Sequence, residues 1–299
     1  MEKYYLCFDI GGTKVKYGIL NSNGQILNKA SYDTPKESLE SFMGPMESII
    51  KGSILSHDIK GISLSCPGFI NPYRGSIEVC QVLSFLEDIS ITDMLREKFN
   101  IPAAIENDAN CVVLAEKFNG AGEKCDSFAV ITIGTGIGGG VFVNGKLIRG
   151  HQFKGGEFNF LINNGLEGVD EKFQIYGDNS STNALIRMYK LYKEIPMTSK
   201  VEGYEVFESA STDINVQAII DKWFQNISYG IINICAMLNP EKILIGGGIC
   251  EREDFIESIE KTLRSIKWWG YVETKIERCC HKNDGGLIGA LYNILNENN

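Results

Sequence analysis

Four short segments of this chain contain the residue types that hold and transfer a phosphoryl group. Three of them are rich in glycine and follow apolar runs, and the fourth is an acidic cluster between the first two. The segments are Asp9–Lys14 (DIGGTK), Glu106–Asn110 (ENDAN), Gly134–Gly140 (GTGIGGG) and Gly246–Gly248 (GGG). Glycine lets a backbone turn approach phosphate oxygens, and a carboxylate can accept the proton of an attacking hydroxyl. Together the four segments predict a kinase that uses ATP.

The first glycine segment, Asp9–Lys14, is expected to be a turn between two strands. Gly11 and Gly12 leave room for a phosphate, and Thr13 and the turn amides can donate hydrogen bonds to its oxygens. Asp9 could hold Mg²⁺ through water, because hard cations prefer carboxylate oxygen. A plain hairpin with an aspartate in its turn would look the same, so this segment alone does not decide between the two.

The second glycine segment contains the GxGxxG pattern of dinucleotide-binding folds. That pattern must open a helix, whereas the continuation Val141–Gly145 has the character of a strand and a turn. A Walker A loop is also excluded, because no Gly-Lys-Ser/Thr follows the glycines. We interpret the segment as an anion-binding turn between strands. Its candidate nucleotide contacts are Gly134, Thr135, Gly136 and Gly138.

The third glycine segment follows the apolar run Lys242–Ile245. Gly246, Gly247 and Gly248 would let a flat ring lie on the backbone, which suits adenine or ribose. The alternative is a tight turn between a strand and a helix.

The acidic cluster Glu106–Asn110 follows a buried-looking strand and precedes a helix. A sugar hydroxyl is a poor nucleophile and needs a carboxylate to accept its proton during phosphoryl transfer. Asp108 could be that base. The alternative is that Asn107 or Asp108 caps the helix that begins at Ala109, and the pentapeptide alone favours the cap.

The overall composition is that of an ordinary globular protein. The chain has 299 residues, which is enough for two domains, and a formal net charge of -9. This acidic balance argues against nonspecific binding to nucleic acid or to an anionic membrane surface. With no signal peptide and no bilayer-spanning stretch, we expect a cytoplasmic location. The nine cysteines form no CxxC pair and are expected to be reduced, mostly buried thiols.

The elements that must position these residues follow one pattern twice. Near the N-terminus, a strand, a Gly turn, a strand, an Asn/Gly turn and a strand predict an antiparallel meander. The same layout recurs after a possible hinge at 120–124, whereas residues 150–180 are expected to be loop. The expected strands are 4–10, 14–20, 25–31, 59–65, 103–105, 127–133, 141–143, 146–149 and 242–245. The expected helices include 36–55, 91–99, 109–118, 214–238, 254–265 and 287–295.

In this order, the segments resemble the motifs of the ROK family of sugar kinases, within the actin-like, hexokinase-type ATPase superfamily. The resemblance covers nearly the whole chain. Asp9–Lys14 and Gly134–Gly140 are similar to the family's two phosphate motifs, and Asn239–Gly248 is similar to its adenosine motif. Cys66-Pro67-Gly68 resembles its sugar-side loop, Glu106–Asn110 its catalytic segment, and Gly155-Gly156-Glu157 the start of its GE-x-x-H segment.

The resemblance implies an α/β fold of two actin-like (ribonuclease H-like) lobes with a cleft between them, which close over a sugar and ATP with the help of Mg²⁺. The N-terminal lobe would comprise residues 1–119, with a C-terminal helix at 287–299 packing back onto it, and the second lobe residues 120–286. Asp108 would be the general base, and Asn107 and Glu157 would hold sugar hydroxyls. The resemblance also implies a homodimer.

The chain departs from the family pattern beside the sugar. Phe160 stands where the family has the histidine of GE-x-x-H, and no cysteine occurs between Cys125 and Cys235 to form its zinc site. A structural zinc needs four nitrogen or sulfur ligands, so we expect none here. Gln174 falls where a second sugar-binding glutamate would lie.

Both departures bear on the acceptor sugar. They remove charged partners of a free anomeric hydroxyl and offer an apolar and amide surface to an aglycone. We therefore expect phosphorylation of the 6-hydroxyl on the non-reducing glucose of a β-glucoside such as cellobiose. The alternatives are a glucokinase, an N-acetylmannosamine kinase or, from another class, a non-catalytic sugar sensor. His151 could also reach the sugar, but a solvent-exposed loop position is favoured.

Overall fold

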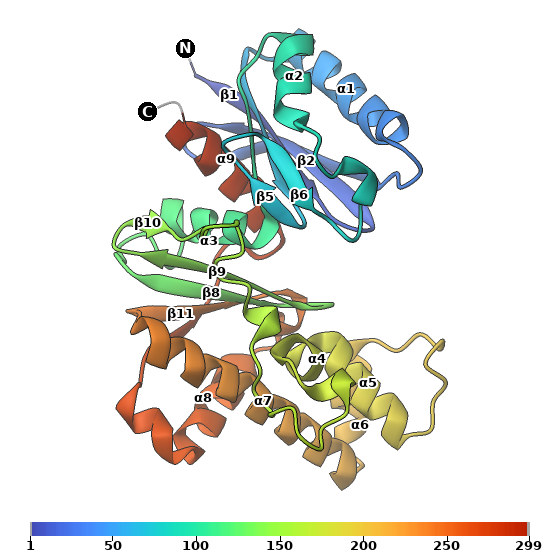
Figure 1. Cartoon of the computed structure of the whole chain (residues 1–299), viewed down its shortest axis with the longest axis vertical. Helices are drawn as coiled ribbons and strands as arrows, with labels where there is room; N and C mark the ends of the chain where they lie inside the picture. Colours follow the sequence, from blue (N-terminus) through green and yellow to red (C-terminus); the bar gives the residue numbers. More distant parts are fainter. Residues whose placement is uncertain (1, 298–299) are drawn as a thin grey trace. The chain divides into compact units, whose positions relative to one another are not determined.

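The computed structural model describes residues 2–297, which form two compact units (Figure 1). Among these residues, unit 1 comprises 2–124, 149–155 and 283–297, and unit 2 comprises 125–148 and 156–282. Residues 120–124, 149–155 and 283–286, which the sequence-based division assigns to the second lobe, are thus grouped with unit 1.

Unit 1 is built on a five-stranded mixed sheet with the order β3-β2-β1-β4-β7. The predicted antiparallel meander is present as β1 (Tyr4–Ile10), β2 (Lys14–Asn21) and β3 (Ile26–Asp33). Strands β4 (Ile59–Cys66) and β7 (Ala103–Asn107) continue the sheet parallel to β1. A hairpin of β5 (Phe69–Asn71) and β6 (Ser76–Val79), which the sequence analysis did not predict, follows β4.

Helices cover both faces of this sheet. The alternation of side chains along β1 sends Leu6 and Phe8 to one core and Tyr5 and Cys7 to the other. The helices of unit 1 are α1 (Leu39–Ser56), α2 (Ile91–Phe99), α3 (Asp108–Asn119) and α9 (Gly285–Glu297). Helix α9 buries Leu287, Leu291 and Ile294 in the core that contains Tyr5 and Cys7, so it packs on this sheet.

Unit 2 repeats the sheet order, as β10-β9-β8-β11-β12. Its antiparallel strands are β8 (Phe128–Ile133), β9 (Ile137–Val143) and β10 (Lys146–Leu147). Strand β11 (Lys242–Gly246) pairs parallel to β8, and β12 (Lys275–Arg278) pairs parallel to β11. The sequence analysis did not predict β12. The repeated strand and glycine layout read from the sequence therefore corresponds to two sheets of one topology.

The helices of unit 2 surround a core whose largest fully buried side chains include Trp223, Tyr176 and Phe255. They are α4 (Tyr176–Ser180), α5 (Thr182–Tyr192), α6 (Gly203–Ala210), α7 (Ile214–Leu238) and α8 (Phe255–Ser265). Helix α7 has the predicted bounds. The segment expected to be loop, 150–180, contains α4 and short 3-10 turns. The 3-10 turns of the chain are η1 (Ser84–Leu86), η2 (Phe158–Phe160), η3 (Glu171–Phe173), η4 (Gly248–Glu251), η5 (Lys267–Tyr271) and η6 (Lys282–Asp284).

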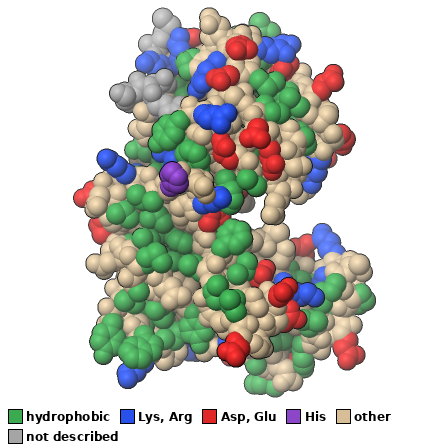
Figure 2. Space-filling model, in the orientation of Figure 1, with side chains coloured by type: hydrophobic (Ala, Val, Ile, Leu, Met, Phe, Trp, Pro, Cys, Tyr) green, Lys and Arg blue, Asp and Glu red, His purple; other side chains and the backbone are tan. Residues whose placement is uncertain are grey.

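The surface carries charged side chains of both signs, as the composition of the chain leads one to expect. On the face drawn in Figure 2, acidic and basic side chains are interspersed. Within residues 2–297, helices that combine the length and the apolar character needed to cross a membrane are absent. Seven of the nine cysteines are buried, Cys279 is half-buried and Cys280 is exposed.

Candidate functional site

In unit 1, the candidate residues lie at the carboxyl ends of three adjacent parallel strands. Asp9 pairs in register with Ser65 of β4, and Cys66 pairs with Asn107 of β7. Each candidate segment directly follows one of these strands, so the sheet brings them to one edge. Ligands of open α/β sheets bind at this edge.

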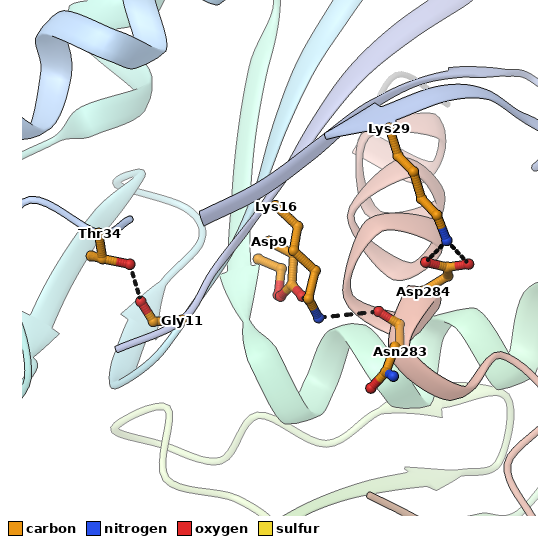
Figure 3. Close-up of polar contacts among 8 residues, drawn as sticks. Asp9, Gly11, Lys16, Lys29, Thr34, Asn283 and Asp284 are labelled. Atoms are coloured by element: carbon orange, nitrogen blue, oxygen red, sulfur yellow. Dashed lines mark hydrogen bonds and ion pairs between the residues drawn. The ribbon is translucent and has the colours of Figure 1, made fainter. Parts of the chain in front are cut away.

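The carboxylate of Asp9 is held by three neighbours, of which Figure 3 shows Lys16. Ser65 Oγ donates to Oδ1 at 2.9 Å, and Lys16 Nζ lies 3.2 Å from Oδ2 and also donates to the carbonyl of Asn283. A Cβ at Gly286 would overlap with the Asp9 carboxylate, so the first turn of α9 approaches it closely. The positive end of a helix dipole stabilises an anion there. The side chain remains 19% exposed, which leaves it accessible to a hydrated cation.

The Gly11–Lys14 turn is fixed by its neighbour Thr34. The amide of Gly11 donates to the carbonyl of Lys14 at 2.9 Å, and Thr34 Oγ1 donates to the carbonyl of Gly11 at 2.7 Å (Figure 3). The Thr34 amide also donates to the carbonyl of Thr13. Thr13 and Lys14 are exposed on this fixed turn, as a phosphate-binding role requires. The sequence analysis did not identify Thr34, because no pattern in the residues around it along the chain indicates this contact.

Asn107 caps helix α3, which is the alternative that the sequence favoured. Its Oδ1 accepts from the Asn110 amide at 3.0 Å, and its Nδ2 donates to the carbonyl of Gly68 at 2.9 Å. Gly68 has φ +103°, and a Cβ there would overlap with the carbonyl oxygen of Val79. The Asn107 side chain therefore also joins the Glu106–Asn110 segment to the Pro67-Gly68 loop. The second proton of Nδ2 and the lone pairs of Oδ1 leave Asn107 further hydrogen-bonding capacity.

Asp108 is the first residue of α3 and its side chain is in contact with solvent. Its Oδ1 accepts from the Ala109 amide at 2.8 Å. Protein on several sides still removes part of the hydration of the carboxylate. This desolvation, with a smaller contribution from the nearby Asp9 charge, outweighs the hydrogen bond and raises the pKa of Asp108 to about 6. An accessible carboxylate with a raised pKa suits a general base near neutral pH.

Glu106 is a structural partner of this segment that the sequence analysis did not single out. It is 1% exposed, and its Oε1 accepts from the Asn107 amide and from Asn110 Nδ2 at 2.8 and 3.0 Å. Its Oε2 forms an ion pair with Arg149 Nε at 2.6 Å. Glu106 therefore holds the backbone around Asp108 and attaches residues 149–155 to it.

In unit 2, the two remaining glycine segments lie side by side. Gly246 pairs with Thr132 in the parallel β8–β11 ladder. Gly247 has φ +105°, and a Cβ there would overlap with the carbonyl oxygen of Ile133. Thr135, Gly136 and Gly248 are exposed. The Thr182 amide, at the start of α5, donates to the carbonyl of Gly134 at 2.9 Å. The middle segment leads into strand β9, as predicted, and not into a helix.

Part of the middle glycine run serves packing. A Cβ at Gly139 would overlap with the ring of Phe158, and one at Gly156 would lie 2.9 Å from the Cα of Gly140. The loop that carries Glu157 therefore lies directly on the backbone of β9. Gly138 is half-exposed and remains a candidate nucleotide contact.

The residues at the expected sugar-specificity positions differ in their surroundings. Glu157 is half-buried at the start of η2, and Phe160, at the end of η2, is 58% exposed. Gln174 Nε2 donates to the carbonyl of Val169 at 3.0 Å, so part of its amide is used within its own loop. His151 is exposed. Residues 2–297 contain no group of three or more His, Cys, Asp or Glu side chains arranged to hold a metal ion.

Two α/β units of one sheet topology, with glycine turns in both and acidic residues at the carboxyl ends of the unit 1 strands, define the actin-like, hexokinase-type fold. The chain belongs to the ROK family, whose sequence model matches residues 5–297.

Relatives are similar over nearly their full length. A β-glucoside kinase of Listeria monocytogenes is 33% identical over 293 residues, which cover 98% of this chain and 97% of that protein. A β-glucoside kinase of Klebsiella pneumoniae is 31% identical over 290 residues, or 96% of this chain and 94% of that protein. The crystal structure of a ROK family protein from Streptococcus pneumoniae in complex with sucrose has a TM-score of 0.87 and 31% identity, and covers 100% of this chain and 99% of that one.

Proposed function

We propose that this protein is an ATP-dependent kinase that phosphorylates the 6-hydroxyl of a sugar, with Asp108 as the general base. The observation that carries the proposal is the Asp108 carboxylate itself, which is accessible, has a raised pKa and starts a helix beside the Asn107–Gly68 contact. The relatives named as kinases support the same reaction.

In the proposed reaction, the sugar 6-oxygen forms a bond to the γ-phosphorus, and the bond from that phosphorus to the β,γ-bridging oxygen breaks. The hydroxyl proton passes to the Asp108 carboxylate, and ADP leaves with the electron pair of the broken bond. Asp108 must be ionised to accept the proton, so the reaction is expected to be slower below pH 6.

The nucleotide would be held by backbone groups of the glycine segments. In unit 2, the exposed residues Thr135 and Gly136 and the adjacent exposed glycines Gly247 and Gly248 present backbone with little side-chain obstruction. In unit 1, Thr13 and Lys14 stand on a turn that Thr34 fixes. Each of these turns by itself fits phosphate oxygens, over which the charge of a triphosphate is distributed.

The donor set at Asp9 fits a hydrated Mg²⁺ ion. Its carboxylate is partly exposed and is held in place by Ser65 and Lys16. When bound, Mg²⁺ neutralises phosphate charge. Asp9, Ser65 and Lys16 would then fix where that charge is neutralised. We do not expect zinc, because Phe160 replaces a ligand and the three cysteines of that site are lacking from the sequence.

We propose the non-reducing glucose of a β-glucoside such as cellobiose as the acceptor. The names of the relatives that are 31–33% identical support this choice, and so does the apolar side chain of Phe160, which is exposed. The Gln174 amide contributes less support than the sequence suggested, because one of its protons bonds to Val169. Glucose and N-acetylmannosamine remain alternative acceptors.

A panel of purified sugars with ATP tests the proposal by ADP release. Cellobiose and methyl β-glucoside should be phosphorylated, and free glucose and N-acetylmannosamine should be poorer acceptors. Strong turnover of either monosaccharide with none of cellobiose would refute the β-glucoside assignment.

Asp108→Asn tests the role of the base. It should lower kcat by about 10²–10⁴-fold while calorimetric sugar binding is retained. If the wild type transfers phosphate to none of the sugars but binds one of them, the protein is a sugar sensor instead.

A further inference from the structure

Unit 1 carries a cluster of aromatic residues next to the Pro67-Gly68 loop. Phe69 begins β5, Tyr73 lies in the turn between β5 and β6, and Phe153 lies in the segment 149–155. The ring centroids of Tyr73 and Phe153 are 6.2 Å apart with the planes inclined by 54°, and Lys154 Nζ lies 5.1 Å from the centroid of Phe69. Tyr73 is 82% exposed and Phe153 is half-buried. The two rings are therefore accessible to a ligand.

This cluster is attached at two points to the segment that contains Asp108. The carbonyl of Gly68, next to Phe69, accepts from Asn107 Nδ2. Arg149 forms its buried ion pair with Glu106, and the amide of Gly155 donates to the carbonyl of Arg149 at 2.8 Å, which closes the segment 149–155 into a loop. The aromatic rings are thus positioned relative to the proposed sugar contacts by bonds within unit 1.

Phe153 has a backbone conformation that a bulky residue rarely adopts. Its φ of +58° lies in the left-handed region, where a residue with a large side chain is strained. In this conformation the ring lies beside Tyr73 and is half-buried. Strained residues of this kind concentrate at ligand-binding sites.

We propose that Tyr73 and Phe153 form a stacking platform for the second ring of the substrate, the aglycone of the β-glucoside. This inference rests on the proposed kinase function and adds a specificity determinant to it. In a β-linked glucose, axial hydrogens make each face of the ring apolar, and such a face packs on an aromatic ring. The platform therefore selects aglycones that contain a ring, such as glucosyl or aryl groups, over a methyl group.

The test compares the KM for cellobiose with the KM for methyl β-glucoside in each variant. Tyr73→Ala and Phe153→Asn remove the two rings, and Asn tolerates the left-handed backbone of position 153. Each should raise the ratio of the two KM values by at least about fivefold, whereas Tyr73→Phe should keep it near the wild-type ratio. Tyr204→Ala, which removes an exposed tyrosine of α6 in unit 2, is the matched control. Thermal unfolding confirms that each variant is folded.

An unchanged ratio in both variants overturns the platform. If the wild type phosphorylates neither glucoside, the β-glucoside assignment fails, and the same variants are then examined by calorimetric binding of cellobiose and methyl β-glucoside. Weaker binding of cellobiose relative to methyl β-glucoside in the variants would support the platform without catalysis, and equal relative affinities would overturn it.

Discussion

Replacing Arg149 by Met should destabilise the protein far more than the loss of a surface cation would. Glu106 is 1% exposed, and the change removes the cation that neutralises its Oε2 while two N–H groups still occupy Oε1. Removing one partner of a buried ion pair costs about 3–5 kcal/mol. The Arg149 side chain is 24% exposed, so water can partly replace it, and we expect a loss of about 3 kcal/mol.

The assay is thermal unfolding followed by circular dichroism. For a unit of this size, about 3 kcal/mol corresponds to a fall in Tm of roughly 6–12 °C. Glu106→Gln in the Arg149→Met background provides the decisive control. The neutral amide oxygen still accepts the two N–H groups, and the uncompensated charge is gone, so part of the lost stability should return.

Two results would refute this reasoning. A fall of less than about 1 kcal/mol for Arg149→Met would mean that the pair behaves like a surface salt bridge. A further loss when Glu106→Gln is added would mean that the buried charge is not the source of the destabilisation.

Three further predictions concern the proposed base, the proposed nucleotide contact and the proposed cation site. Asp108→Asn should raise Tm at pH 7.5, because the raised pKa of Asp108 means that its ionised form is less favourable in the folded protein than in the unfolded chain. This gain in Tm should disappear as the pH falls from about 6 toward 4, and an equal gain at pH 4 would contradict the prediction. Gly247→Ala should raise the KM for ATP at least tenfold and lower the free energy of unfolding by roughly 1–3 kcal/mol, because its Cβ would overlap with a carbonyl oxygen. Gly270→Ala is the control and should have neither effect, because its Cβ would have no described atom within 4 Å. Asp9→Asn should raise the Mg²⁺ concentration needed for half-maximal rate, and an unchanged Mg²⁺ dependence would remove Asp9 from the proposed cation site.

The sequence predicted the features that depend on local pattern. The long apolar periodicity of 214–238 gave the bounds of α7, and the strand pattern after the middle glycines was enough to exclude a dinucleotide fold. The meander and its recurrence were also visible, because each strand ends at a glycine or asparagine turn.

Features that depend on distant contacts were missed. Strand β12 has only four residues, and its parallel pairing with β11 defines it as a strand. The Glu106–Arg149 pair joins positions 43 residues apart, and Arg149 lies just before a segment that was expected to be loop. Gly139 lies in the segment that we interpreted as an anion-binding turn, but a Cβ there would overlap with Phe158, and no local pattern reveals this contact.

The discontinuity of the two units has a consequence for how the chain folds as it is synthesised. Helix α9 supplies Leu287, Leu291 and Ile294 to the core beneath β1, yet these residues emerge from the ribosome after all of unit 2. Until then, one apolar face of the first sheet is open. The nascent N-terminal segment should therefore be a chaperone client, and a fragment that ends at Lys124 should be insoluble unless a peptide of residues 283–297 is supplied with it.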